Sequence, residues 1–261
     1  MSILTPVAGP QAVYRINPVA KLGAAAIVSI VLVLSIDWVS ASVALACEAV
    51  LFLLAGLTPR RFFLRTLPIW IAAPLGGITT LLYGREDGEV FARFLLIVVS
   101  DGSIELAIAT TLRVLAIGLP AVVLFVTVDP TDLADGLAQV LRLPARFVLG
   151  ALAGLRLVGL FADDWRSLEL ARRARGIGDT GRLRRFAGQA FALLVLSVRR
   201  GTKLATAMEA RGFGSSTPRT WARDSRFSWP EWTLIAIAVV VATTATTVSV
   251  ALGEWNFIVG G

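Results

Sequence analysis

The run SIELAIATTLRVLAIGLPAVVLFVTV, residues 103–128, is the longest of five apolar segments in this chain. A helix needs about 20 residues to cross a bilayer core roughly 30 Å thick, so this segment is long enough to span a membrane. Similar segments lie at about 22–36, 39–57, 64–83 and 229–251, the first of them short. We therefore expect an all-α, polytopic membrane protein with about five transmembrane helices.

The composition supports a membrane protein and excludes several kinds of site. Of the 261 residues, 56% are hydrophobic, and the mean hydropathy is +0.75, which is too high for an ordinary soluble domain. The chain has no histidine and a single cysteine, Cys47. This excludes a disulfide framework, a Cys/His zinc site and histidine acid–base chemistry. We expect no metal, no cofactor and no enzyme activity of its own.

Basic residues are concentrated between Arg142 and Arg226. This segment contains 17 Lys/Arg and 6 Asp/Glu, a net charge of +11 in a chain of net charge +7. Basic segments beside membrane spans are typical of the cytoplasmic side. Arg15 and Lys21, which precede the first span, place the amino terminus on the same side by the same rule. Nucleic-acid binding is not expected, because the basic segment lacks interleaved aromatic residues and a known binding module.

We divide the chain into three parts on this basis. Residues 1–128 carry the first four spans, 129–226 form a cytoplasmic coupling region, and 227–261 contain the last span and the carboxyl terminus. The expected location is the plasma membrane, in a multi-pass arrangement. Residues 90–100 are apolar but too short to cross the bilayer, so we expect a re-entrant or interfacial piece there.

Three helices are expected inside the coupling region. A short one begins with Thr131 or Asp132 as its cap. Two long ones follow, over 145–175 and 183–211, and small residues recur in the first of them. Because small residues let helices approach closely, we expect the two long helices to cross.

Each of the two long helical stretches ends in the same pattern. The pattern A-x-x-A-R-G-(apolar)-G occupies residues 171–178 and again 207–214. Glycine suits the left-handed residue that commonly ends a helix, so the arginine before it ends the helical run. Its long side chain presents five donors beyond a face of small residues. The candidate docking residues are Arg175 with Ala171, Ala174 and Gly176, and Arg211 with Ala207, Ala210 and Gly212.

Two similar basic helix ends suggest a partner with two similar sockets. The alternative is that Arg-Gly simply ends two amphipathic helices at a charged membrane surface.

Two charged residues lie in the middle of predicted spans. Glu48 lies in the second span and Arg113 in the fourth, at a similar depth. Charges inside a membrane are costly and are usually paired or face a cavity, so we expect Glu48 and Arg113 to form an ion pair. The alternative is a proton or ion site.

The motifs resemble the transmembrane T component of energy-coupling factor (ECF) transporters, which are ATP-driven importers. The stretch 17–22, Asn-Pro-Val-Ala-Lys-Leu, resembles the family's amino-terminal Asp-Pro-x-x-Lys-Leu, with Asn in place of Asp. The stretch 128–133, Val-Asp-Pro-Thr-Asp-Leu, resembles the passage into the coupling helices. The triplets at 174–176 and 210–212 match the family's paired Ala-Arg-Gly signatures.

The resemblance implies a transmembrane coupling subunit. Arg175 and Arg211 would each dock into one of two cytosolic ATP-binding subunits, and the helices would pass their motion to a separate membrane subunit that captures a vitamin or a nickel or cobalt ion. The chain lacks the G-x-x-x-x-G-K-[ST] phosphate loop, so ATP hydrolysis is expected on the partners.

Three other classes remain as alternatives. Asp132, Asp135, Gly136 and Ala138 resemble the start of a CDP-alcohol phosphatidyltransferase signature, but the downstream carboxylates are missing. A secondary transporter would show discontinuous spans and inverted repeats. The permease of an ordinary ABC importer would carry one docking tip per chain.

Overall fold

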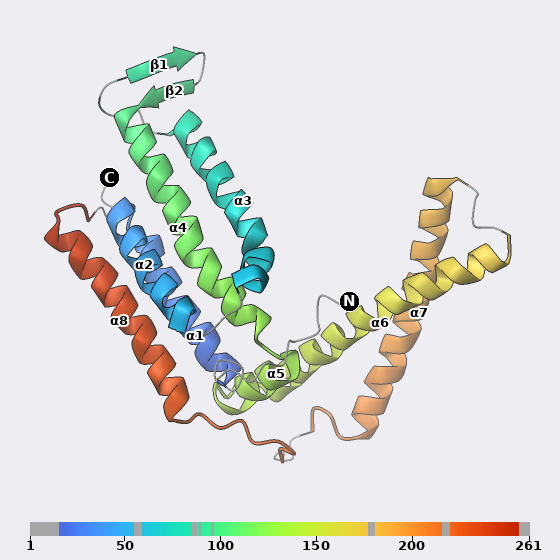
Figure 1. Ribbon diagram of the computed structural model, residues 1–261. Helices are drawn as coiled ribbons and strands as arrows, with labels where there is room; N and C mark the ends of the chain where they lie inside the picture. The colour runs from blue at the N-terminus through green and yellow to red at the C-terminus, as the bar shows by residue number, and fades with distance from the viewer. Residues whose placement is uncertain are drawn as a thin grey trace. The chain divides into compact units, whose positions relative to one another are not determined.

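The computed structural model describes most of the chain as helix. The described residues are 16–54, 59–84, 88, 90–94, 97–176, 181–215 and 220–255. The elements are α1 (Pro18–Leu34), α2 (Trp38–Leu54), α3 (Pro59–Tyr83), β1 (Val90–Phe94), β2 (Ile97–Ser100), α4 (Asp101–Val126), α5 (Pro130–Gln139), α6 (Ala145–Ala174), α7 (Arg182–Ala210) and α8 (Trp229–Ala251). The prediction of an all-α, polytopic membrane protein is confirmed, apart from one short hairpin (Figure 1).

The chain forms two compact units. The first covers the chain up to Leu133 and resumes at Arg226, and we call it the membrane bundle. The second runs from Ala134 to Ser225, and we call it the helix-pair unit. The boundary between the units falls within α5.

In the membrane bundle, α4 packs against α1, α2 and α3, and α8 packs against α1 and α2. Most of the packed side chains are small or β-branched, which lets the helices approach closely. The buried cluster shared by α1, α2, α4 and α8 consists of Ala24, Val28, Leu32, Ala44, Ala116, Ala238, Val241 and Ala245.

Helices α3 and α4 make an especially close approach at Gly77. A Cβ atom added there would lie 2.1 Å from the Thr111 hydroxyl oxygen and 3.0 Å from the Ala107 carbonyl oxygen. Only a residue without a side chain fits at this point. At Gly76, one residue earlier, an added Cβ atom would meet nothing within 4 Å.

Among the residues that the structure describes, four helices are long and apolar enough to cross a membrane. They cover Phe62–Tyr83, Asp101–Leu124, Ala145–Ala174 and Trp229–Ala251. Helices α1 and α2 are also apolar, but each has 17 residues, about 25 Å at 1.5 Å per residue. Helix α6 is therefore long and apolar enough for a span. From the sequence, we predicted that it belongs to the coupling region.

Residues 90–94 and 97–100 form two antiparallel strands. Strand β1 pairs with β2, with Phe94 opposite Ile97 and Val90 opposite Ser100, and a bulge interrupts the register near Val90. The expectation of a re-entrant or interfacial piece stays a prediction, because a two-stranded ribbon has unpaired edges that only water or protein can satisfy.

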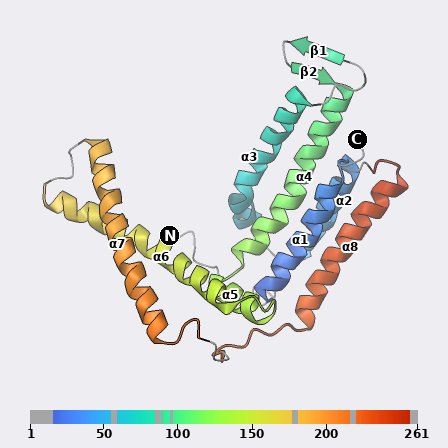
Figure 2. The same cartoon turned by 180° about the vertical axis from the view of Figure 1, so that it is seen from behind.

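In the helix-pair unit, α6 and α7 cross each other, as predicted; Figures 1 and 2 show the crossing from opposite sides. Helix α5 packs on the start of α6 through Ala134, Ala138 and Val148. The side chain of Gln139 donates to the Arg223 carbonyl at 2.8 Å and accepts from the Ser225 amide at 2.9 Å. The amide of Gln139 thus holds the chain that leaves this unit.

Candidate docking site at two arginine helix ends

The first helix end closes α6 at Ala174. Arg175 is the capping residue, with φ −87° and ψ 4°. Gly176 follows with φ +69°, and its amide donates to the Arg173 carbonyl at 3.0 Å. The predicted left-handed glycine after the arginine is confirmed here.

The second helix end repeats this geometry at the end of α7. Arg211 caps the helix with φ −91° and ψ 13°, and Gly212 has φ +75°. The amide of Gly212 donates to the Glu209 carbonyl at 2.9 Å, and the amide of Phe213 donates to the Met208 carbonyl at 2.9 Å. These two bonds form a Schellman motif, which satisfies the carbonyls that a helix end otherwise leaves free.

The predicted docking residues are all exposed. They are Ala171, Ala174, Arg175 and Gly176 at the first end and Ala207, Ala210, Arg211 and Gly212 at the second. Within the described part of the chain, neither arginine side chain has a hydrogen-bond or ion-pair partner. Both arginines are thus exposed at the ends of their helices.

Contacts between α6 and α7 hold the two helix ends apart. Asp164 on α6 forms a two-bond ion pair with Arg200 on α7, with one bond at 3.0 Å. Nearer the end of α6, Arg172 donates to the Arg185 carbonyl at 3.2 Å. From Arg172 back to Asp164 on α6, the contacted residue of α7 moves forward from Arg185 to Arg200, so the helices run in opposite directions.

The spacing of the helix ends follows from this arrangement. Helix α7 begins shortly after the first end and has 29 residues, about 43 Å at 1.5 Å per residue. The second end follows directly after it. The two arginines are therefore presented at opposite ends of the crossed pair, not as one cluster.

The predicted ion pair between Glu48 and Arg113 is not formed. Arg113 donates to the backbone carbonyl of Ser35, and the carboxylate that acts on it electrostatically is that of Asp37. Glu48 is buried, and neither of its carboxyl oxygens has a hydrogen-bond partner among the described residues. Similar positions along the two predicted spans did not bring these residues together, because Arg113 extends toward the carboxyl end of α1 instead.

Asp37 lies between α1 and α2 and organises that end of the bundle. Its carboxylate accepts from the Ser40 amide at 2.6 Å and from the Ser40 hydroxyl at 2.8 Å. It also accepts from the Ser249 hydroxyl of α8 at 2.7 Å. The residue between α1 and α2 is therefore also a junction with α8.

Sequence reasoning missed a second junction at the other end of the bundle. Lys21 is buried and donates to Thr127, while Asn17 bonds to Glu231 at the start of α8. The capping-box pattern from Ser228 to Glu231 could have indicated part of it. The partner of Lys21, 106 residues away, has no signal in the sequence.

The described residues offer no place for a metal: no group of three or more His, Cys, Asp or Glu side chains lies close enough to hold one. Asn17, Lys21 and Asp37, which are buried polar residues of the bundle, join helices instead.

These features define a class of protein: a multi-pass membrane subunit that carries two matched, exposed arginine helix ends on a crossed helix pair. The profile of the CbiQ family, described as "Cobalt transport protein", matches residues 10–220. The chain therefore belongs to the CbiQ family.

Several proteins described as "Energy-coupling factor transporter transmembrane protein EcfT" are similar to the chain. The one from Limosilactobacillus fermentum is 26% identical over 67% of this chain and 69% of its own length. That from Exiguobacterium sibiricum is 28% identical, over 70% and 74%. The relative from Brevibacillus brevis is 23% identical over 96% of both chains. The protein is thus a non-catalytic transmembrane component of an ECF transporter, which works in a complex with other subunits.

Proposed function

We propose that the chain transmits ATP-driven motion from two cytosolic ATP-binding subunits to a separate membrane subunit that captures the transported compound. One observation carries this proposal: the same helix ending, with the same exposed arginine and left-handed glycine, occurs at Arg175 and at Arg211. A single Arg-Gly ending has many uses. Two copies on one crossed pair support two similar sockets on the partners.

Arginine suits such a joint for a physical reason. Its planar fork makes two parallel hydrogen bonds to a carboxylate or binds several carbonyls at once. Truncating a desolvated charge pair costs about 2–5 kcal/mol, whereas a charge at the rim of an interface contributes little. Two such joints would let the helix pair follow the movement of two motor subunits.

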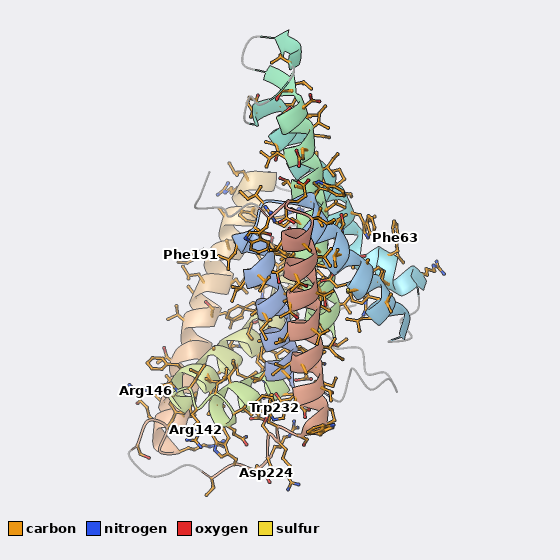
Figure 3. The ribbon with its side chains drawn as sticks, turned by 90° about the vertical axis from the view of Figure 1, so that its left-hand side faces the viewer. Phe63, Arg142, Arg146, Phe191, Asp224 and Trp232 are labelled. Carbon is orange, nitrogen blue, oxygen red and sulfur yellow. The ribbon has the colours of Figure 1, made fainter. Side chains whose placement is uncertain are left out.

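The exposed apolar side chains of α6 and α7 support contact with a membrane partner. Phe147, Val158 and Leu170 on α6 are each more than half exposed. On α7, Leu183, Phe186, Phe191, Leu194, Val195 and Val198 are equally open (Figure 3 labels Phe191). An apolar surface this large is costly in water, so we assign it to the substrate-capturing subunit or to lipid.

ATP hydrolysis and cargo selection are assigned to the other subunits. The chain has no phosphate loop, so ATP hydrolysis takes place on the ATP-binding subunits. The cargo, a vitamin or a transition-metal ion, is selected by the separate subunit, and the description of the CbiQ family supports cobalt as one candidate. The amino terminus and the helix-pair unit lie on the cytoplasmic side, as the basic residues of 142–226 favour.

The test is the double substitution Arg175→Glu with Arg211→Glu. We expect the protein to insert normally but to lose the ATPase subunits during purification in detergent, because each reversed charge meets a socket built for a cation. Co-purification followed by mass spectrometry measures the retained subunits.

The matched control reverses two exposed arginines away from the helix ends, Arg166→Glu on α6 and Arg199→Glu on α7. It changes the net charge equally, and it should retain the ATPases. Full retention by the Arg175/Arg211 variant would contradict the docking proposal.

A further inference from the structure

Lys21 is almost completely buried near the start of α1, with 1% of its surface exposed. Its ammonium nitrogen donates to both the carbonyl oxygen and the hydroxyl oxygen of Thr127, each at 3.0 Å. Removing a charged group from water is costly unless hydrogen bonds replace the lost hydration. The two bonds to Thr127 supply that replacement, and they fix a single position for the lysine.

Thr127 occupies a critical place in the chain. It directly follows the last residue of α4, and α5 begins three residues later, at Pro130. A cation at this point complements the free carbonyls and the negative end of the α4 dipole. Asp132, in the first turn of α5, also acts electrostatically on Lys21. Lys21 therefore holds the point at which the chain leaves the fourth span.

The same turn of α1 is joined to α8. The Asn17 amide donates to one carboxyl oxygen of Glu231 at 3.0 Å, and the other oxygen accepts from the Ser228 amide at 2.7 Å. The Asn17 side chain donates to the Arg226 carbonyl at 3.1 Å. The start of α1, the start of α8 and the end of α4 are thus tied together within a few residues.

We infer that Lys21 is a positioning residue for coupled transport: it joins the end of α4 to α1, so that motion entering through α5 moves α1, α4 and α8 as one body. This inference rests on the proposed function, because it assigns a role within the transmission from the ATPases to the membrane bundle. Arg175 and Arg211 receive the motion, and Lys21 delivers it to the spans.

The test uses the full transporter complex carrying Lys21→Met, which keeps an unbranched side chain but removes the donors. We expect the ATPases to co-purify and to hydrolyse ATP as in the wild type. Substrate taken up per ATP hydrolysed should fall by at least about fivefold. A purely structural role would lower the amount of folded complex without changing this ratio.

Two further variants sharpen the result. Thr127→Val removes the hydroxyl acceptor but keeps the carbonyl, so its uptake per ATP should fall less than that of Lys21→Met. Lys203→Met, which changes the chain's other lysine, an exposed residue of α7, should leave the ratio unchanged. An unchanged ratio in Lys21→Met would overturn the inference.

A measurement on the unaltered complex covers the case in which Lys21→Met does not fold. An amine-reactive reagent should modify Lys203 at least about ten times faster than Lys21, both without nucleotide and with an ATP analogue bound. Equal modification rates of Lys21 and Lys203 in either state would show that the contact between Lys21 and Thr127 opens. This result would also overturn the inference.

These outcomes are separable from failure of the proposed function. If the chain docks no ATPases, the wild-type complex itself lacks them and the Arg175/Arg211 variant behaves as the wild type. If only the inference is wrong, docking is normal and Lys21→Met couples normally.

Discussion

Arg175 and Arg211 are exposed because of the glycine that follows each of them. A left-handed residue turns the chain away from the helix axis, so the arginine remains the outermost residue of its helix. Gly176 and Gly212 adopt φ values of +69° and +75°, which other residues adopt at a cost of about 1–2 kcal/mol. Both glycines therefore maintain the shape that presents the guanidinium group.

We expect Gly212→Ala to loosen the end of α7. Forcing a Cβ atom into the left-handed region costs about 1 kcal/mol, which speeds local opening about fivefold. Hydrogen–deuterium exchange at the Gly212 and Phe213 amides measures this. Gly201→Ala in the middle of α7 is the control, since an added Cβ atom meets nothing there and alanine favours the helix. Equal exchange in both variants would contradict the assigned role.

The buried charges of the bundle lead to a second prediction at this scale. In double-mutant cycles of thermal unfolding in detergent, Arg113→Gln should couple to Asp37→Asn by about 1 kcal/mol or more. Its coupling to Glu48→Gln should lie near zero, because these two side chains do not pair. A strong coupling between Arg113 and Glu48 would restore the ion pair expected from the sequence.

Individual helices were predicted well where a long apolar stretch is bounded by residues that begin or end a helix. The two long helices, expected over 145–175 and 183–211, are observed as Ala145–Ala174 and Arg182–Ala210. The cap of α5 was predicted wrongly, because the side chain of Asp129, not Thr131 or Asp132, accepts from the Thr131 amide at 2.7 Å. Proline at the next position favours this, since Pro130 suits the first turn of a helix.

At the scale of helix pairs, Gly77 sets the distance between α3 and α4. We expect Gly77→Ala to lower the free energy of unfolding by about 1–3 kcal/mol, the usual cost of overpacking. The Ala107 carbonyl belongs to the backbone and has little freedom to move away.

Gly76→Ala is the control, because its Cβ atom has open space. Thermal unfolding of the two variants in detergent measures the difference. If Gly77→Ala is as stable as Gly76→Ala, the close approach is not a packing constraint.

For the molecule as a whole, the topology proposal can be tested by cysteine labelling. In a Cys47→Ala background, Val90→Cys in the hairpin should react with a membrane-impermeant maleimide in intact cells. Ser215→Cys, after the second arginine helix end, should react only after permeabilisation. This contrast follows from the excess of basic residues between 142 and 226. Labelling of Ser215→Cys in intact cells would reverse the proposed orientation.

The same test decides the role of α6. Helix α6 satisfies the length and hydropathy of a span, yet it forms an ion pair with α7 and ends in an exposed arginine. If α6 crossed the membrane and the antiparallel α7 returned through it, the two arginine helix ends would face opposite sides. Arg173→Cys, at an exposed position beside the first helix end, and Ser215→Cys should therefore share one labelling pattern.

Local information was enough for the long helices and the two arginine endings, because apolar length, capping residues and the conformational freedom of glycine act within a few positions of the chain. The buried polar contacts required the folded chain. Lys21 meets Thr127, Asn17 meets Glu231 and Arg113 meets the Ser35 carbonyl across 106, 214 and 78 positions. In a membrane bundle, a buried charge must find whichever carbonyl or carboxylate the packing of small residues brings within reach, and that choice exists only once the helices have packed.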